Sequence, residues 1–227
     1  MRLGDLQYSD LLVLLKESGI PQRMIVDDHS EKCWVIRHDI DNHIENAYRM
    51  AVLENAFGVC STYYFLNYDS GIDEDENYFY KPLSAKLYQE MADLGHDIGW
   101  HNNAITEWIK DDKACMEDII RKPLEHLRSL GLDVKSSASH GDRWCRKYGY
   151  VNYEVWEEFE CKNHLGMERY KMGDFGLDME AYLMKRSHYL SDSGGRWNVE
   201  DAMGYVRDWI EKGEGNLQIL IHSQWWG

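Results

Sequence analysis

The 227-residue sequence has few prolines, few cysteines and no long apolar runs. Only three prolines occur, and 44 % of the residues are hydrophobic, a composition that disordered chains do not have. No apolar run approaches the ~20 residues that a membrane-spanning helix requires, so we expect no membrane span. The five cysteines are odd in number and contain no Cys-X-X-Cys pair, which argues against a disulfide framework and a thiolate zinc site.

Positive charge is also scarce. The 25 lysines and arginines face 40 aspartates and glutamates, which gives a formal charge of −15. Nucleic acid and anionic lipid repel such a surface, so we expect neither as a partner. A chain of this length buries about 70 % of its unfolded surface, enough for one core without staples. We therefore interpret residues 1–227 as a single domain.

The first twenty residues do not have the pattern of a secretory leader. No basic segment precedes an unbroken apolar stretch there. The leucines from Leu6 to Leu15 instead alternate with polar residues at helical spacing, up to Pro21. This pattern predicts an amphipathic helix within residues 1–20 that packs on the domain. We accordingly expect a cytoplasmic protein with reduced cysteines.

Short β-rich runs alternate with longer helical patterns along the rest of the chain. The predicted strands cover residues 33–38, 61–66, 97–101, 136–140, 187–191 and 217–222, with a weaker one near 164–171. The predicted helices cover residues 44–57, 82–94, 112–130 and 199–212, with Asn198 as the N-cap of the last. The alternation predicts an α/β fold built from right-handed βαβ units with a mostly parallel sheet.

Five predicted strands run into a histidine or an aspartate at their carboxyl ends. These residues are Asp39 with Asp41, His101, His140, Asp192 and His222. The carboxyl ends of parallel strands share one edge of a sheet or barrel, which is where α/β active sites are built. The sequence therefore predicts an active site at this edge.

Two of these residues indicate a metal. Asp39 and Asp41 lie two positions apart, so both side chains point to the same side of an extended segment. Carboxylates held this close require a cation or a shared proton. His101 and His140 would complete a site with Asp41, one carboxylate and two histidines, which suits zinc, manganese or iron.

The remaining strand-end residues suggest roles around that metal. Asp39 would act as the base for a water molecule that the metal activates, and His222 would be the acid that protonates the leaving group. Arg143 would steady a carboxylate, while Asp192 would orient His222.

Other side chains near these strand ends are ambiguous or have an ordinary structural explanation. His38 and His96 are expected to be hydrogen-bonded inside the protein. Trp197 and Trp225 are expected to bind substrate by stacking on a sugar ring, with packing in the core as the alternative, and Trp100 is expected in the core. No glycine-rich phosphate motif and no nucleophile elbow occur in the sequence, which gives nucleotide binding and a serine or cysteine nucleophile little support.

Four segments, in this order, resemble the motifs of the polysaccharide deacetylases, the NodB-homology domains of carbohydrate esterase family 4. They are residues 37–41 (RHDID), 95–101 (GHDIGWH), 191–197 (SDSGGRW) and 220–226 (LIHSQWW). The resemblance covers about residues 34–226 and looks closer to the HDxD subgroup, found among surface-polysaccharide and O-antigen biosynthesis genes. It implies a distorted (β/α) barrel of about seven strands. It also implies metal-dependent removal of an N- or O-acetyl group from a sugar or glycan precursor.

Carried over by position, the resemblance makes Asp39 the base and Asp41 a metal ligand, although one residue here separates two acids that are usually adjacent. His101 matches the first histidine of the family's metal-binding pair. The second histidine of that pair would fall at Ile105. We expect His140 to replace it as the third ligand, with zinc as the metal and manganese or iron as alternatives.

The resemblance also makes His222 the catalytic acid, supported by Asp192 and Trp197. The family's arginine-proline-tyrosine motif is absent, and residues 139–143 (SHGDR) stand in its place. Arg143 is therefore the predicted partner of the base.

The leading hypothesis is thus a metal-dependent carbohydrate deacetylase. One alternative is a non-catalytic relative that binds a glycan or a partner protein through a degenerate metal site. Another is a deformylase or other C–N hydrolase on the same scaffold, since water attack serves both reactions.

Overall fold

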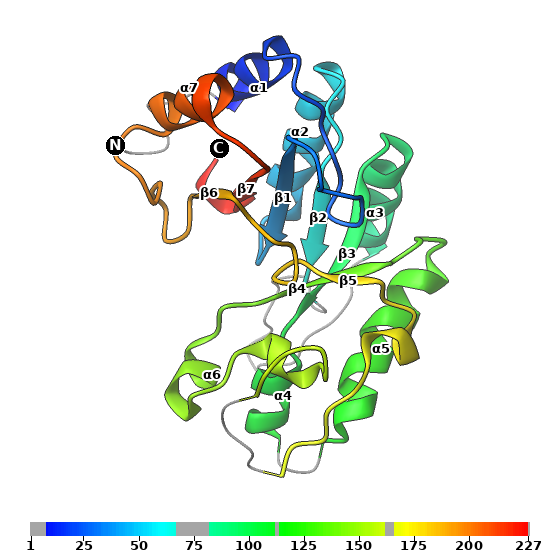
Figure 1. The fold of residues 1–227 in the computed structure, drawn as a ribbon. Helices are drawn as coiled ribbons and strands as arrows, with labels where there is room; N and C mark the ends of the chain where they lie inside the picture. The colour runs from blue at the N-terminus through cyan, green and yellow to red at the C-terminus, as the bar shows by residue number, and fades with distance from the viewer. Residues whose placement is uncertain (1–7, 67–81, 112–113, 162–165, 227) are drawn as a thin grey trace.

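The computed structural model describes residues 8–66, 82–111, 114–161 and 166–226 (Figure 1). Seven parallel strands form one sheet in the order β5-β4-β3-β2-β1-β7-β6. They are β1 (Trp34–Ile40), β2 (Thr62–Phe65), β3 (Asp97–Asn102), β4 (Ser136–Ser139), β5 (Met179–Glu180), β6 (His188–Ser191) and β7 (Leu217–Ile221). The predicted α/β class with a parallel sheet is confirmed.

The α-helices are α1 (Tyr8–Glu17), α2 (Ile44–Ala56), α3 (Pro82–Asp93), α4 (Ala104–Lys110), α5 (Met116–Ser129), α6 (Arg143–Tyr148) and α7 (Ala202–Lys212). Residues of α1, α2, α3, α5 and α7 form the two larger core clusters with the sheet. The short 3₁₀ turns are η2 (Asn152–Val155), η3 (Met172–Phe175) and η4 (Ser223–Trp225). Within the described residues no helix has both the length and the apolar content needed to cross a membrane.

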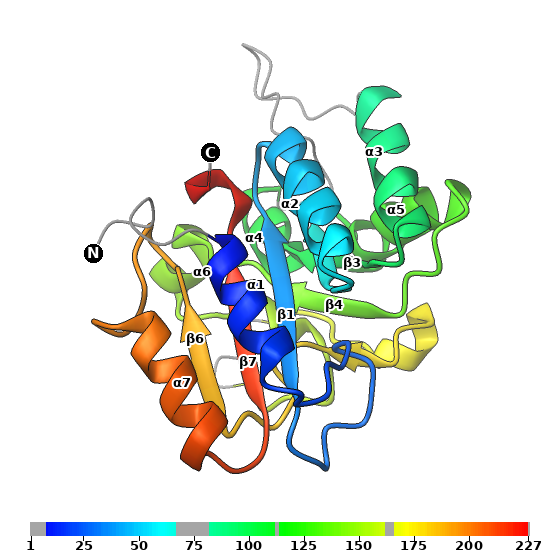
Figure 2. The same cartoon turned by 90° about the horizontal axis from the view of Figure 1, so that it is seen from above.

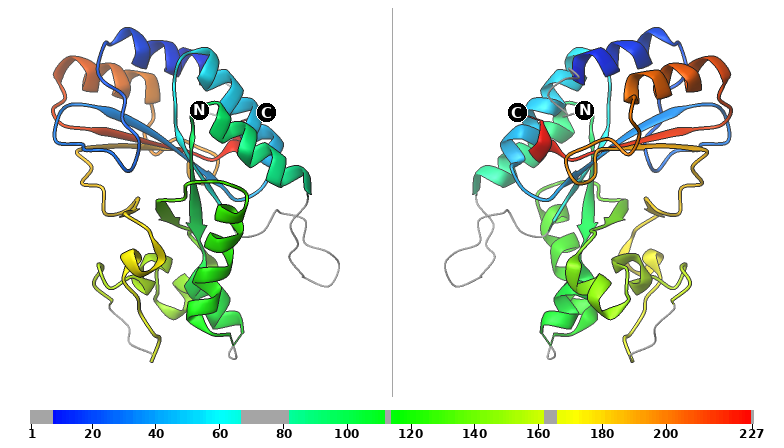
Figure 3. Two further views of the ribbon diagram at one scale, coloured as in Figure 1. Left: turned by 90° about the vertical axis from the view of Figure 1, so that its right-hand side faces the viewer. Right: turned by 90° about the vertical axis from the view of Figure 1, so that its left-hand side faces the viewer.

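The sheet curls into a half-barrel (Figure 3). Its two outer strands, β5 and β6, do not pair with each other in the described part of the chain, so the wall is open between them. This architecture is compatible with the predicted distorted barrel of about seven strands. Ile25, Ala181 and Met184, which lie outside the strands, pack against the inner face of the sheet in a small buried cluster.

The two faces of β1 have different surroundings because side chains alternate along a strand. Trp34 and Ile36 pack outward, into a core cluster with leucines of α1 and residues of α7. In Figure 2, α1 and α7 lie side by side across β1, β6 and β7. The predicted amphipathic helix within residues 1–20 is therefore present as α1. Val35 packs with the inner cluster, and Arg37 and Asp39 follow it at alternate positions.

A glycine makes room on the inner face of the sheet. Gly99 of β3 is paired with Tyr64 of β2, and a Cβ atom at position 99 would lie 2.3 Å from the Tyr64 ring. Only glycine accommodates such a close approach.

Three details differ from the sequence prediction. Strand β5 is Met179–Glu180 and not the weaker strand predicted near 164–171. The described residues of that segment form only an isolated bridge, between Trp156 and Tyr170. A two-residue strand is too short to show a periodicity. The N-cap of α7 is Asp201, whose Oδ1 accepts a hydrogen bond from the Gly204 amide at 2.8 Å, and not Asn198. Helices α4 and α6, of seven and six residues, were not predicted.

Candidate metal centre and active site

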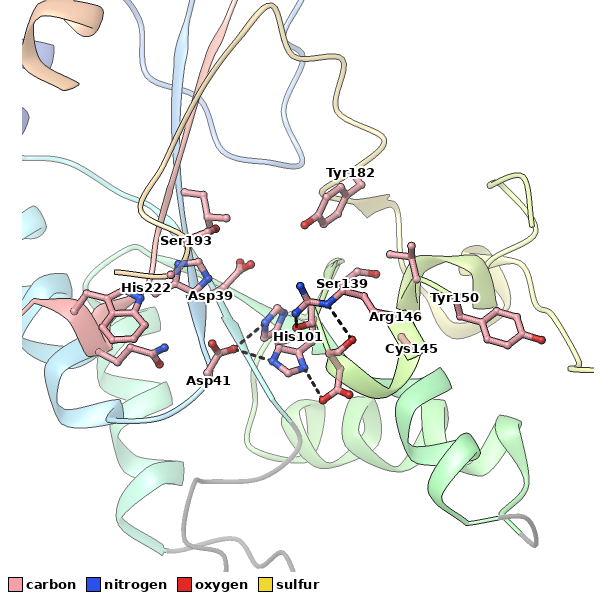
Figure 4. Close-up of a pocket in the computed structure, with 18 residues that line it drawn as sticks. Asp39, Asp41, His101, Ser139, Cys145, Arg146, Tyr150, Tyr182, Ser193 and His222 are labelled. Atoms are coloured by element: carbon pink, nitrogen blue, oxygen red, sulfur yellow. Dashed lines mark hydrogen bonds and ion pairs between the residues drawn. The ribbon is translucent and has the colours of Figure 1, made fainter. Parts of the chain in front are cut away.

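The carboxyl ends of the strands surround a pocket of about 660 Å³ on the inner side of the half-barrel (Figure 4). Six of the nine predicted site residues line it, and they come from segments far apart in the sequence. These six are Asp39, Asp41, His101, His140, His222 and Trp225. The parallel topology brings them together, as the strand-end argument predicted.

Asp41, His101 and His140 form a group that could hold a metal ion. The Nε2 atoms of His101 and His140 lie 3.2 Å and 3.4 Å from the same carboxylate oxygen, Oδ1 of Asp41. One ligand atom from each residue lies within 4.8 Å of the other two. Ile105, the position at which the resemblance expects a histidine, is buried in the main core cluster and does not line the pocket.

The outer nitrogen of each histidine is held by a hydrogen bond. His101 Nδ1 donates to the Ala138 carbonyl oxygen at 2.7 Å, and His140 Nδ1 donates to Asn103 Oδ1 at 3.2 Å. These bonds place the Nδ1 protons away from Asp41 and turn both Nε2 lone pairs toward it, as in metal sites. Asp41 Oδ1 is buried and accepts no hydrogen bond. A divalent cation would satisfy these three atoms together, so the residues fit a metal.

Electrostatics favour two of the three ligands in their metal-binding protonation states, a carboxylate and a neutral imidazole. Burial raises the pKa of Asp41, but the contact with His101 and the charges of both histidines outweigh it and bring it to about 2. Burial and the neighbouring His101 lower the pKa of His140 to about 4. Burial also lowers the pKa of His101, but the Asp39 and Asp41 carboxylates outweigh this effect, so the pKa of His101 lies above its ordinary value.

Asp39 lies beside this group with one oxygen paired and one unpaired. Arg37 Nη2 donates to Asp39 Oδ2 at 2.8 Å, while Oδ1 is buried without a hydrogen bond. Burial raises the pKa of Asp39, yet the charges of Arg37, His101 and His222 more than offset it and hold the pKa below its usual value. Asp39 is therefore an ionised carboxylate with a free acceptor oxygen at the pocket.

The prediction that Arg143 is the partner of Asp39 is wrong. Arg143 begins α6, is exposed and does not line the pocket. Its place is taken by Arg37, which is fully buried and has its guanidinium carbon 4.9 Å from the centre of the Tyr182 ring. The two-residue spacing of Arg37 and Asp39 on β1 was a signal for this pair, because it puts both side chains on one face.

His222 is held from behind by Asp192, which is completely buried. His222 Nδ1 donates to Asp192 Oδ1 at 2.7 Å, and the His222 amide donates to both carboxylate oxygens at 3.0–3.1 Å. Trp226 Nε1 donates to Asp192 Oδ2 at 2.9 Å. Burial lowers the pKa of His222, but the hydrogen bond to Asp192 and the Asp39 charge raise it above its ordinary value overall. The geometry places Asp192 where an orienting residue was predicted.

The two tryptophans expected to contact a sugar lie in different environments. Trp197 is buried in the core cluster with α1 and α7, its ring 5.8 Å from that of Trp226, and it does not line the pocket. The expectation that Trp197 binds substrate is therefore corrected: it packs in the core. Trp225 is 43 % exposed, lines the pocket and packs over Gly195, where a Cβ atom would meet its ring at 3.4 Å.

His38 and His96 are hydrogen-bonded inside the protein, as predicted. His38 Nε2 donates to Glu54 Oε1 at 2.7 Å, and Tyr63 and Tyr8 donate their hydroxyls to the same carboxylate. His96 Nδ1 accepts from the Ser61 amide and His96 Nε2 donates to a carbonyl oxygen of α2, both at 3.0 Å. Neither histidine lines the pocket.

Sequence reasoning missed Arg146 and Tyr182, which both line the pocket. Arg146 lies on the unpredicted helix α6, and Tyr182 follows the unpredicted strand β5. Neither residue carried a signal in the sequence, since no predicted element ended beside it.

Comparison with known proteins returned no match, either to a family model or to a curated protein sequence.

Proposed function

We propose that this protein is a metal-dependent hydrolase that removes an acetyl group from an N- or O-acetylated sugar, in the manner of the polysaccharide deacetylases that its sequence resembles. One observation carries the proposal. An Asp-His-His group, an ionised carboxylate with a free oxygen and a histidine oriented by a buried aspartate all face the same pocket. These are the parts that water attack on an amide or ester requires.

Asp39 is the proposed base. Its unpaired Oδ1 accepts a proton from the attacking water, while the bond from Arg37 to Oδ2 keeps the carboxylate ionised and fixed in orientation. Because Arg37 is fully buried, its charge acts with little screening by solvent.

His222 is the proposed acid. With Nδ1 bonded to Asp192, the ring presents Nε2 to the pocket and donates its proton there to the departing amine or hydroxyl. The raised pKa of His222, set by Asp192 and Asp39 against the effect of burial, favours the protonated ring that this step needs.

Asp41, His101 and His140 are the proposed ligands of the metal. Zinc suits two imidazoles and one carboxylate with a position left open, and manganese or iron are alternatives. When bound, such a metal polarises the acyl carbonyl and lowers the pKa of a water molecule.

The same residues would serve hydrolysis of a formyl group or of another C–N bond by the same proton transfers. A binding-only relative is the weaker candidate, because His140 stands where a third ligand is needed and Asp39, His222 and Asp192 are all in place.

Metal content of the purified protein, measured by inductively coupled plasma mass spectrometry, tests the proposal first. We expect about one metal per chain in the wild type and a strong loss in His140→Ala. His29→Ala is the matched control, since His29 lies outside the pocket and its Nε2 contacts the Met24 carbonyl oxygen. Absence of metal after supplementation with zinc, manganese and iron would favour the binding-only relative.

The bond is tested by the released acid. Incubation of the metal-loaded protein with N-acetylated, O-acetylated and N-formylated hexosamines, followed by quantification of acetate and formate, separates the reactions. Acetate from an acetylated sugar is the expected product, whereas formate alone would make the protein a deformylase.

A further inference from the structure

The charge of the pocket is unevenly distributed. Three carboxylates line it, those of Asp39, Asp41 and Asp142. Among the described lining residues, Arg146 is the one lysine or arginine. In a chain with a formal charge of −15, an arginine at the pocket wall needs an explanation.

Arg146 is not held by a carboxylate. Its described hydrogen bonds go to two backbone carbonyl oxygens, from Nη2 to Gly141 at 3.3 Å and from Nε to Asp142 at 3.5 Å. Both bonds are long, and the side chain is exposed. A guanidinium carries five N–H donors, so most of its capacity is left for another group.

Two arginines have an acidic partner among the described residues, while others, such as Arg128 and Arg169, donate to backbone carbonyl oxygens outside the pocket. Arg37 pairs with Asp39 inside the half-barrel, and Arg121 contacts Glu117 on the surface of α5. Arg146 differs from all of these because it lines the pocket, and its described contacts there are two backbone carbonyl oxygens and no carboxylate (Figure 4).

The geometry of the guanidinium group favours anionic ligands. Its planar fork matches the two oxygens of a phosphate or a carboxylate, and such bonds are stronger than those between neutral groups. The pocket, at about 660 Å³, is within the range that holds a ligand larger than an acetyl group. A sugar that carries an anionic substituent would satisfy both the pocket and the free donors.

We propose that Arg146 binds an anionic substituent of the substrate, a phosphate or a carboxylate, so that the protein acts on a charged sugar and not on a neutral polysaccharide. This inference rests on the proposed hydrolase function. The charged substituent lies on the side of the pocket formed by residues 140–146, next to the ligand His140.

The test compares three N-acetylated substrates of the metal-loaded protein. They are N-acetylglucosamine 1-phosphate, an N-acetylhexosaminuronic acid and the neutral methyl glycoside of N-acetylglucosamine. We expect the wild type to prefer one of the anionic substrates in kcat/KM by roughly 10- to 100-fold, the contribution of hydrogen bonds to a charged group. The preferred anion identifies the substituent as a phosphate or as a carboxylate.

Arg146→Gln should remove that preference, mainly through a higher KM for the anionic substrate, and should leave the neutral glycoside unaffected. Arg143→Gln is the matched control, because Arg143 lies on the same helix, is exposed and does not line the pocket. Equal rates on all three substrates in the wild type would overturn the inference. An equal loss on all three in Arg146→Gln would do so too, since Arg146 would then only support the segment that holds His140.

A binding measurement separates this inference from the proposed function. Calorimetric titration of the Asp39→Asn protein with each of the two anionic sugars reports affinity without turnover. A Kd that rises roughly 10- to 100-fold when Arg146→Gln is added supports the anion site even if no acyl group is hydrolysed. Hydrolysis that occurs with no dependence on Arg146 leaves the proposed function in place and rejects the anion site.

Discussion

At the residue scale, three alternate positions of one strand carry much of the site. Arg37, Asp39 and Asp41 follow each other at spacing two along β1 and its end, so their side chains lie on the inner face of the half-barrel. Arg37 donates a hydrogen bond to Asp39, and Asp41 contacts two histidines. One short segment thus supplies the proposed base, the arginine paired with it and a proposed metal ligand.

Replacing Asp39 tests its proposed role as the base directly. Asp39→Asn keeps the shape of the side chain but removes the proton acceptor, so we expect turnover of the acetylated sugar to fall by roughly 10²- to 10⁴-fold. Metal content should stay near the wild-type level, because the ligand group does not include Asp39. Asp133→Asn, at an exposed aspartate outside the pocket, should turn over like the wild type. Unchanged turnover in Asp39→Asn would reject the assignment.

The pH profile of kcat/KM tests the proposed role of His222 as the acid. The pKa of His222 lies above its ordinary value because the effects of Asp192 and Asp39 exceed that of burial, and a catalytic acid is active only below its pKa. Asp192→Asn removes one of these charges, so the alkaline limb of kcat/KM should move to lower pH. A limb that stays in place, with metal content unchanged, would mean that another group is the acid.

At the element scale, Glu54 joins parts of the fold that the sequence separates. It lies on α2, and its buried carboxylate receives hydrogen bonds from Tyr8 of α1, His38 of β1 and Tyr63 of β2. A single side chain therefore ties two helices to two neighbouring strands. Asp39, the proposed base, comes directly after one of the donors.

Removing this carboxylate should cost stability more than activity. Glu54→Ala leaves a buried histidine and two buried hydroxyls without their acceptor, and we expect the free energy of unfolding in urea to fall by about 3–5 kcal/mol. Glu45→Ala, an exposed position on the same helix, should change it by less than about 0.5 kcal/mol. Equal effects of the two substitutions would show that the buried contacts add nothing.

The same stabilisation should depend on pH in a known direction. Burial raises the pKa of Glu54, but the contact with His38 opposes this effect, and the folded-state pKa lies below the ordinary value. The contribution is therefore present above about pH 4.3 and is lost as the pH falls through the folded-state pKa. The difference in stability between the wild type and Glu54→Ala should narrow in acid.

At the scale of the whole molecule, the half-barrel collects strand ends around one pocket. A metal held by residues that follow β1, lie on β3 and follow β4 would link the carboxyl ends of three strands. The unfolded chain does not hold these residues together, so metal binding should favour the folded state.

Metal removal should therefore lower the thermal stability. A site saturated at 100 times its Kd adds about 2.7 kcal/mol, which corresponds to roughly 5–10 °C in Tm for a domain of this size. We expect a chelator to lower the Tm of the wild type by this amount in scanning calorimetry and to leave the Tm of His140→Ala nearly unchanged. A chelator effect of equal size in both proteins would place the metal elsewhere.

The sequence by itself determined the strand-helix alternation, the parallel sheet and the residues at its carboxyl edge. Each of these depends on neighbouring positions: apolar runs define the buried strands, and polar residues follow them at Asp39, His101, His140 and His222. Because parallel strands end at one edge, local patterns were enough to place these side chains at one pocket.

Only the tertiary structure decided which side chains meet. Arg37 rather than Arg143 reaches Asp39, Trp197 lies in the core while Trp225 faces the pocket, and Arg146 faces the pocket from a six-residue helix. These outcomes depend on the curl of the sheet and on short elements whose position is set by packing across the chain. Local sequence patterns do not contain information on such long-range contacts. The sequence therefore identified the candidate side chains, and the tertiary structure determined which of them interact.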